Sequence, residues 1–169
     1  MKLASIEAIV RALNDAEVRY LIGGGLAVNA HGYLRFTKDA DLVIDLVPDN
    51  VLRAVDALEA LGYRPALPVD AHDFADPDTR RFWIDEKNMQ VFQLWSDHHP
   101  ETPIDIFAEL PFPFDDEYRR ALHKPLYGTL DVPFVSLDTL IRLKEAAGRQ
   151  QDRIDLEHLR LRQDDHDRT

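Results

Sequence analysis

The chain of 169 residues contains no cysteine, which excludes disulfide bonds and thiol chemistry and is consistent with a cytoplasmic protein. It also has no apolar run of about 18 residues, so we expect no membrane-spanning helix. The N-terminal stretch MKLASIEAIVRALNDAEV carries acids inside its apolar pattern, and this predicts an amphipathic helix instead of a signal peptide.

A basic block is missing as well, and the formal net charge is -11. Proteins that bind nucleic-acid backbones broadly carry a basic face, so the acidity argues against that function. It leaves room for a local cationic pocket. Where several acids converge, it also favours attraction of divalent cations.

The hydrophobic pattern predicts an α/β fold with a mixed sheet flanked by helices. Expected helices cover 5–13, 25–32, 50–61, 136–148 and 150–161, and expected strands cover 18–24, 40–47 and 102–110. Two hairpins are expected, one over 80–95 with its turn at Lys87-Asn88 and one over 125–135 around Gly128. Asp49 and Ser136 are expected helix caps, and the tail after 162 is expected to fray.

These elements fit one domain over 1–169, with a core of about 1–135 and a C-terminal helical part of about 136–161. Proline residues bound the short strands late in the chain, which favours a mixed sheet over a doubly wound parallel one.

A run of three glycines, Gly23 to Gly25, follows the apolar stretch VRYLI. A strand that stops at such a pair and enters a helix leaves backbone N–H groups that can hold a phosphate. Taken alone, the glycines are better explained by a tight turn, because a single glycine cluster is a weak signal. They form neither a dinucleotide fingerprint nor a P-loop, because the required further spacings are missing.

Asp39 and Asp41 begin the next expected strand, and residues two apart in a strand share a face about 6.6 Å apart. At ~6 Å and an effective dielectric near 20 their repulsion is on the order of 3 kcal/mol. A divalent cation would reverse this repulsion. The alternative is a polar strand entrance with two solvated acids.

Together the glycines and acids form the pattern G-G-x-A-x-x-x-x-G-x-x-R-x-T-x-D-x-D. Its members are Gly24, Gly25, Ala27, Gly32, Arg35, Thr37, Asp39 and Asp41. This pattern resembles the nucleotidyltransferase superfamily with the DNA polymerase beta-like fold. Within it, the chain is most similar to the small prokaryotic branch that includes the AbiEii-type toxins and the minimal nucleotidyltransferases. The resemblance covers about 18–110 and extends into the C-terminal helices.

The resemblance implies that Gly24 and Gly25 hold the triphosphate of an NTP, and that Asp39 and Asp41 bind Mg²⁺ in a two-metal site. It also implies a third metal-binding acid that activates the attacking hydroxyl, and the matching residue is Asp105 in PIDIF. Taken alone, a single strand acid such as Asp105 is more often a solvent-facing residue. Asp45 shares the parity of the pair but lies about 13 Å further along the strand, so we leave it out of the metal site.

Arg35 and Thr37 flank the acids at the same parity, and both are candidates for phosphate contacts, while Arg35 could also pair with an acid.

Lys144 lies on the apolar stripe of the helix expected over 136–148, so it either snorkels or reaches a polar site. The run K-x-x-A-G-R-x-x-D-x-x-D from Lys144 to Asp155 resembles one common in the same branch. On this basis we interpret Lys144 as a triphosphate contact. Arg149 either assists it or pairs with Asp152 or Asp155, which we interpret as braces.

The resulting hypothesis is a Mg²⁺-dependent enzyme that moves an NMP from an NTP to a hydroxyl and releases pyrophosphate. The acceptor is left open among RNA such as a tRNA end, a protein hydroxyl and a small molecule, and the toxin-type branch would add an antitoxin partner. The alternative is a non-catalytic module that binds a nucleotide or a partner and kept only the fold.

Overall fold

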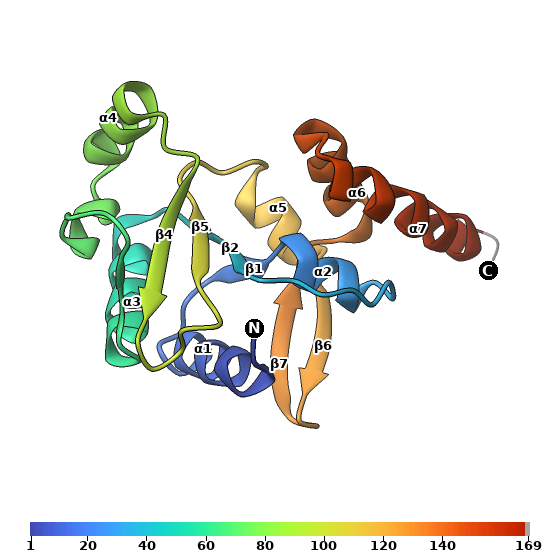
Figure 1. Ribbon diagram of the computed structural model, residues 1–169, viewed down its shortest axis with the longest axis horizontal. Helices are drawn as coiled ribbons and strands as arrows, with labels where there is room; N and C mark the ends of the chain where they lie inside the picture. Colours follow the sequence, from blue (N-terminus) through green and yellow to red (C-terminus); the bar gives the residue numbers. More distant parts are fainter. Residues whose placement is uncertain (168–169) are drawn as a thin grey trace.

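The computed structural model describes residues 1–167 and folds them around a seven-stranded sheet in the order β3-β4-β5-β2-β1-β7-β6 (Figure 1). The strands are β1 (Tyr20–Ile22), β2 (Ala40–Ile44), β3 (Tyr63–Pro65), β4 (Val91–Ser96), β5 (Ile104–Phe107), β6 (Leu122–Leu126) and β7 (Leu130–Phe134). The helices are α1 (Leu3–Asp15), α2 (Gly24–Ala30), α3 (Pro48–Ala60), η1 (Ala71–Ala75), α4 (Pro77–Lys87), α5 (Phe114–Arg119), α6 (Leu137–Ala147) and α7 (Gln150–Asp167).

The sheet is mixed, as predicted: β2 runs parallel to β5 and antiparallel to β1, and β1 runs parallel to β7. Successive residues of a strand point to opposite faces, and both faces are covered here. Leu42 and Ile44 pack with α1 and α3 in one apolar cluster, whereas Leu21 and Val43 pack with α2, α6 and α7 in another. The α/β prediction is therefore confirmed.

The predicted hairpin over 80–95 is wrong in its first half, which is the helix α4. The helix begins at Asp76, whose carboxylate accepts from the Thr79 N–H at 2.8 Å, and it ends at Asn88 in the left-handed conformation with φ 52°. Arg80 and Trp83 are its buried residues, three apart, so the apolar spacing is helical. The second half is β4, as expected.

Smaller differences concern element ends. Strand β1 stops at Ile22 because the chain turns into α2 at Gly24, and β5 is shorter than the strand expected over 102–110. Asp49 lies in the first turn of α3 and does not cap it. The sequence analysis also missed β3, η1 and α5.

The C-terminal part agrees with the prediction up to its last turns. The strands β6 and β7 form the expected hairpin around Gly128. The helix α6 is capped by Ser136 and ends at Gly148 in the left-handed conformation. Helix α7 continues to Asp167, so the expected fraying of the tail is wrong as far as that residue, and 168–169 lie outside the described residues. Across the described chain no helix is long and apolar enough to span a membrane.

Candidate active site

The parallel pairing of β2 with β5 brings together the acids of two separate segments. Asp41 stands directly opposite Asp105 in the register, and neighbouring strands lie ≈ 4.7–4.9 Å apart. Asp39 precedes β2 by one residue, and the strand entrance is fixed where the Ala40 N–H donates to the Pro103 carbonyl at 2.9 Å. The order of strands in the sheet therefore brings Asp41 and Asp105 together, because it makes β2 and β5 neighbours.

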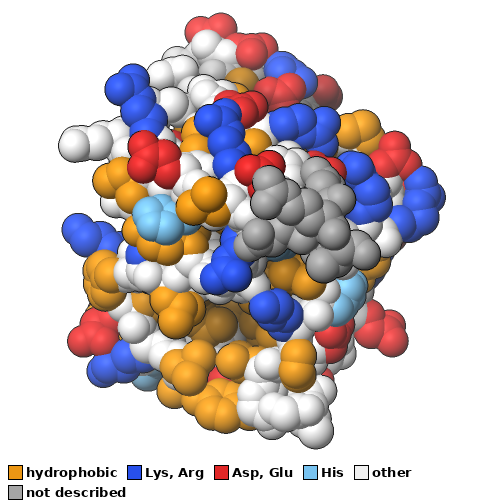
Figure 2. Space-filling view, turned by 90° about the vertical axis from the view of Figure 1, so that its right-hand side faces the viewer, with side chains coloured by type: hydrophobic (Ala, Val, Ile, Leu, Met, Phe, Trp, Pro, Cys, Tyr) orange, Lys and Arg blue, Asp and Glu red, His pale blue; other side chains and the backbone are white. Residues whose placement is uncertain are grey.

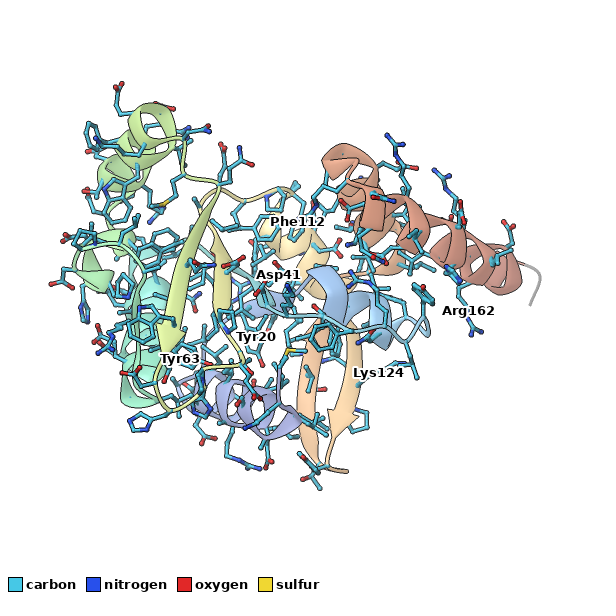
Figure 3. All side chains as sticks on the ribbon, in the orientation of Figure 1. Tyr20, Asp41, Tyr63, Phe112, Lys124 and Arg162 are labelled. Atoms are coloured by element: carbon cyan, nitrogen blue, oxygen red, sulfur yellow. The ribbon has the colours of Figure 1, made fainter. Side chains whose placement is uncertain are left out.

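The glycine turn packs directly against these acids, and Figure 3 shows Asp41 in the middle of the molecule beside α2. Gly24 has φ +55°, and a Cβ there would lie 1.7 Å from Oδ2 of Asp41. A Cβ at Gly25 would lie 2.4 Å from Oγ1 of Thr37. Both positions need glycine because the acid and the threonine occupy the space of a side chain. The Gly23 N–H also donates to the Asp41 carbonyl at 2.9 Å, which ties the turn to β2.

A polar pocket of about 330 Å³ lies over these groups, and every site residue predicted from the sequence lines it. Its lining residues are Gly24, Gly25, Arg35, Phe36, Thr37, Lys38, Asp39, Asp41, Asp105, Lys144, Arg149, Gln151 and Asp152. Asp45 is absent from this lining and pairs instead with Arg19 at 2.7 Å.

A larger cavity of about 690 Å³ lies at the C-terminal end of α2 and is lined by Arg120, Lys124 and Arg162 but no carboxylate. Figure 2 views the side of the molecule that bears the end of α7, where basic side chains alternate with hydrophobic ones. Size alone would favour this cavity. The smaller pocket is the better candidate for chemistry because the acids converge there.

Two acids of the pocket, Asp41 and Asp105, are destabilised in their charged form. Burial, together with the charges of Asp105 and Asp39, raises the pKa of Asp41 to about 6. Burial also raises the pKa of Asp105, with a contribution from Asp39, while a hydrogen bond from Gln93 acts in the opposite direction. These acids thus lack enough positive charge nearby, which is the condition that a divalent cation would correct.

The donor set fits Mg²⁺, which binds proteins through one or two carboxylates and completes its shell with water and substrate phosphates. The three acids do not form a closed cage of ligand atoms. Within the described residues, the one set of three side chains whose ligand atoms all lie within 4.8 Å is Asp56, Glu59 and His72, at the exposed junction of α3 and η1.

The exposed junction is better explained as an ion-pair cluster than as a metal centre. Hydrogen bonds from His72 to Asp56 and Asp70, 2.8 and 2.9 Å long, raise the pKa of His72 to about 9. These hydrogen bonds occupy both ring nitrogens of His72, so neither is free to bind a metal in this arrangement. His72 therefore acts as a cation that ties η1 to α3.

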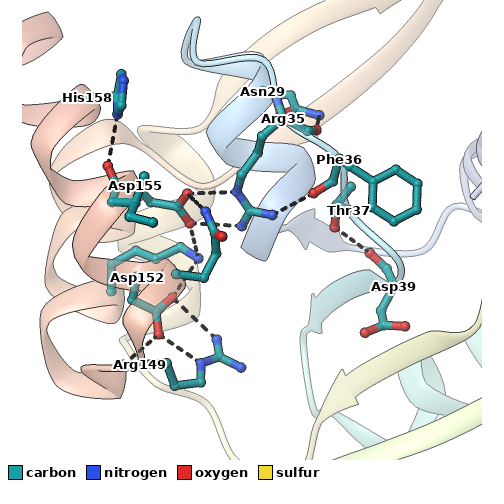
Figure 4. A network of polar contacts seen from close by, with 12 residues as sticks. Asn29, Arg35, Phe36, Thr37, Asp39, Arg149, Asp152, Asp155 and His158 are labelled. Atoms are coloured by element: carbon teal, nitrogen blue, oxygen red, sulfur yellow. Dashed lines mark hydrogen bonds and ion pairs between the residues drawn. The ribbon is translucent and has the colours of Figure 1, made fainter.

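Opposite the acids, the pocket wall is a buried charge network between α6 and α7 (Figure 4). Lys144 is 5% exposed, and its ammonium contacts Asp152 at 2.8 Å and Asp155 at 2.9 Å. Arg35 donates to both carboxylate oxygens of Asp155, at 2.7 and 2.8 Å, and Arg149 contacts Asp152 at 2.8 Å. Lys144 thus has two carboxylate partners inside the protein, which the sequence did not reveal.

This network stabilises its carboxylates in the charged form. Burial opposes ionisation of Asp152, but hydrogen bonds from Arg149 and Lys144 hold its pKa below the ordinary value. Burial likewise opposes ionisation of Asp155, and hydrogen bonds from Arg35 and Lys144 lower its pKa. The cations and acids of this wall therefore fix the position of Arg35 beside the glycine turn.

The sequence analysis missed two polar side chains that support the site. Gln93 faces Asp105 across the β4–β5 pair, and its Nε2 donates to Oδ1 of Asp105 at 3.0 Å. The side-chain amide of Asn29 clamps the backbone of Arg35, accepting from its N–H at 2.9 Å and donating to its carbonyl at 3.0 Å. Neither could be found by spacing, because each contact depends on which elements become neighbours.

No family model and no curated protein matches the sequence. Solved structures do match the fold. The lincomycin-bound lincosamide antibiotic adenylyltransferase LnuA aligns with a TM-score of 0.62 and 14% identity over 92% of this chain and 94% of its own. ANT(2")-Ia in complex with adenylyl-2"-tobramycin aligns with a TM-score of 0.59 and 16% identity over 93% of this chain and 86% of its own.

An antigenic nucleotidyltransferase-like protein from Paracoccidioides brasiliensis aligns with a TM-score of 0.52 and 17% identity, over 93% of this chain and 74% of its own. At such identities the likeness concerns the fold, and the chain has the nucleotidyltransferase fold. The narrower assignment to the AbiEii-like branch stays a prediction.

Proposed function

We propose that this chain is a Mg²⁺-dependent nucleotidyltransferase, which moves an NMP from an NTP to a hydroxyl group and releases pyrophosphate. The observation that carries the proposal is the convergence of Asp41 and Asp105 from parallel strands, with Asp39, beneath the Gly24–Gly25 turn. A strand position occupied by an uncompensated acid is costly for folding. Asp41 and Asp105, with Asp39 in the same pocket, are best explained by divalent cations that arrive with the NTP.

The triphosphate would lie over the turn at Gly24 and Gly25, where the first N–H groups of a helix have no partner within the helix. Thr37 and Arg35 lie directly beside Gly25, and both are proposed phosphate contacts. Arg149 is the other proposed contact, because its side chain is 76% exposed and lines the same pocket. These groups would hold the polyphosphate without changing the fold.

Asp39 and Asp41, with Asp105, would hold the metal ions. Bound Mg²⁺ would neutralise charge on the phosphoryl oxygens and help the pyrophosphate to leave. The carboxylates themselves supply the negative charge that selects a metal-bound NTP over a free one. Their repulsion in the empty pocket then becomes part of the binding free energy.

Asp105 would act as the general base. In the proposed step the acceptor oxygen bonds to the α-phosphorus, the bond from that phosphorus to the bridging oxygen breaks, and the hydroxyl proton passes to Asp105. Its raised pKa suits a base, because proton transfer is most effective when the pKa lies near the working pH. Gln93 would fix one carboxylate oxygen and leave the other to accept the proton.

Lys144 keeps a proposed role at the triphosphate, but the network changes how it would act. Its ammonium already pairs with Asp152 and Asp155, so it would contribute a positive field at the pocket wall and need not leave its partners.

For the acceptor we propose a small hydroxylated molecule. Of the aligned structures, one is bound to lincomycin and another to adenylyl-2"-tobramycin. The net charge of -11 of this chain disfavours a long RNA. An RNA end or a protein hydroxyl, with an antitoxin partner and a cytoplasmic location, belongs to the toxin-type alternative. A non-catalytic nucleotide-binding module is the remaining alternative, and the presence of all three acids speaks against it.

Labelled ATP, CTP, GTP and UTP, each with Mg²⁺ and a panel of hydroxylated acceptors, test the proposal. We expect labelled product and pyrophosphate from the wild type and none from Asp39→Asn or Asp41→Asn. Asp85→Asn, at an exposed position on α4, is the matched control and should keep full activity. Full activity in both site variants would refute the mechanism, and nucleotide binding without transfer to any acceptor would favour the non-catalytic module.

A further inference from the structure

An extended segment between α2 and β2 runs along the rim of the polar pocket, and its burial alternates strictly. The partly buried residues are the odd ones: His31, Tyr33, Arg35, Thr37 and Asp39. The exposed residues are the even ones: Gly32, Leu34, Phe36 and Lys38. A period of two is that of a strand, although this segment is not part of the sheet. It therefore has an inner face that packs against the protein and an outer face toward solvent.

The inner face is held firmly by polar contacts. Asn29 bonds both backbone groups of Arg35, and the Arg35 guanidinium binds both oxygens of Asp155. Nη1 of Arg35 also donates to the Phe36 carbonyl at 2.9 Å. The backbone at Phe36 is thus fixed by its neighbours, while its own ring contributes little to the core.

The outer face presents apolar groups that folding alone does not explain. Phe36 is 73% exposed and Leu34 is 82% exposed. A single exposed apolar residue is ordinary. Phe36 differs because it lines the pocket of the three acids together with the exposed Lys38, and Leu34 does not. In Figure 4 the Phe36 ring points away from the charged network between α6 and α7.

A flat aromatic ring on a fixed backbone, with a cation two residues further on, suits a nucleotide. Bases stack on aromatic side chains, and this contact tolerates every base because each has a π face. The ordering cost of binding is small where the platform is already in place. The adjacent Lys38 would meet a phosphate oxygen of the same molecule.

We infer that Phe36 is the stacking platform for the base of the NTP, with Lys38 as an accessory phosphate contact. The inference rests on the proposed function, because it places the polyphosphate over the neighbouring glycine turn. Phenylalanine has no hydrogen-bonding group, so the platform itself does not distinguish the four bases. The chain should therefore accept several NTPs, ranked by stacking area.

Calorimetry with two probes, each with Mg²⁺, tests the platform: α,β-methylene-ATP, which has a base, and inorganic tripolyphosphate, which has none. We expect Phe36→Ala and Phe36→Leu to weaken binding of the ATP analogue by about 5- to 150-fold, the range that stacking of one base implies. Binding of tripolyphosphate should not change. Phe36→Trp keeps an aromatic ring, so it should bind the ATP analogue about as well as the wild type. Leu34→Ala, on the same face but outside the pocket, should leave the affinity for both probes unchanged.

An unchanged affinity for the ATP analogue in Phe36→Ala would overturn the inference, as would an equal loss for both probes. A loss confined to a short single-stranded RNA would also overturn it and assign the ring to an acceptor. No binding of either probe by the wild type would overturn both the platform and the nucleotidyltransferase.

The two proposals can also fail separately. A base-dependent loss in Phe36→Ala, in a wild type that transfers no nucleotide, keeps the platform and removes the enzyme. Nucleotide transfer that depends on Asp41 but not on Phe36 keeps the enzyme and removes the platform.

Discussion

Two pairs of aspartates line or border the same pocket, and their environments are opposite. Asp41 and Asp105 come from neighbouring strands, and burial together with nearby acids raises their pKa values. Asp152 and Asp155 come from α7, and their cationic partners lower their pKa values despite burial. The difference teaches that burial does not by itself define a functional acid. What distinguishes the strand pair is the shortage of compensating charge.

The largest expected effect concerns catalysis. Replacing Asp41 with Asn removes a proposed metal ligand, and metal ions supply several kcal/mol of transition-state stabilisation. Since ~1.4 kcal/mol is a factor of ten in rate, we expect kcat/KM for transfer to fall by about 10²- to 10⁴-fold. A radiolabel assay with saturating Mg²⁺ measures the fall, and circular dichroism checks the fold. A loss below about tenfold would place Asp41 among merely structural acids and erase the contrast.

The next effect concerns stability and the helical pair. Asp152 is 1% exposed, so replacing it with Asn leaves the buried Lys144 ammonium with one carboxylate fewer. Breaking a buried ion pair costs about 3–5 kcal/mol. We expect a loss of that order in urea denaturation of Asp152→Asn. Asp116→Asn, which removes an exposed pair with Arg119 on α5, should cost about 1 kcal/mol or less.

The two variants should both lose stability, and the difference in the size of the loss sharpens the comparison. If Asp152→Asn were as stable as Asp116→Asn, the charge network would not be a brace.

The strand pair should show the reverse sign in its dependence on pH. The pKa of Asp41 is about 6 in the folded protein against an ordinary 3.8, so the folded state holds this proton more tightly. The resulting stability is fully present below pH 3.8 and is lost as pH rises through about 6. Without metal, wild type should lose up to ~3 kcal/mol relative to Asp41→Asn across this window.

Urea denaturation at several pH values in EDTA measures the difference. Asp152 and Asp155 add little there, because their lowered pKa values place their titration below the ordinary 3.8. Added Mg²⁺ should remove part of the loss in wild type and have no such effect in Asp41→Asn. If the difference in unfolding free energy between wild type and Asp41→Asn did not change with pH, ionisation of Asp41 would not destabilise the fold.

The same contrast explains what the sequence could predict. The acids at 39, 41 and 105, the glycine pair and the cations of the pocket follow from local spacing and from the resemblance, and the structure places all of them in one pocket. Parity along a strand is a local property, so Asp39 and Asp41 could be assigned to a common face. The α/β fold followed from the same periodicities.

What could not be predicted depends on contacts between distant segments. The pairing of β2 with β5 decides that Asp41 faces Asp105, and the docking of α7 decides that Lys144 meets two aspartates. The stretch RRFWIDE fits a strand as well as a helix, and only the cap at Asp76 marks it as the helix α4. Local spacing therefore predicts which residues belong to the site, whereas the contacts between them depend on how the strands and helices pack.

The smallest expected effect concerns Gln93, and it separates positioning from structure. Its amide donates to Asp105 at 3.0 Å from an exposed position on β4, and this bond opposes the rise in the pKa of Asp105. Replacing Gln93 with Met keeps the length of the side chain and removes the donor, so the pKa of Asp105 should rise further. The acidic limb of the kcat/KM profile should then move to higher pH, with only a few-fold loss of rate at alkaline pH.

A role in packing alone would lower the rate equally at all pH values and leave that limb in place. Gln93→Asn keeps the amide on a shorter side chain. If the distance to Asp105 matters, its pH profile should differ from that of the wild type and resemble that of Gln93→Met. A profile identical to wild type in Gln93→Met would mean that Asp105 owes its properties to burial and to Asp39 alone. The strand pair would then differ from the helical pair in having no hydrogen-bond partner that influences its chemistry.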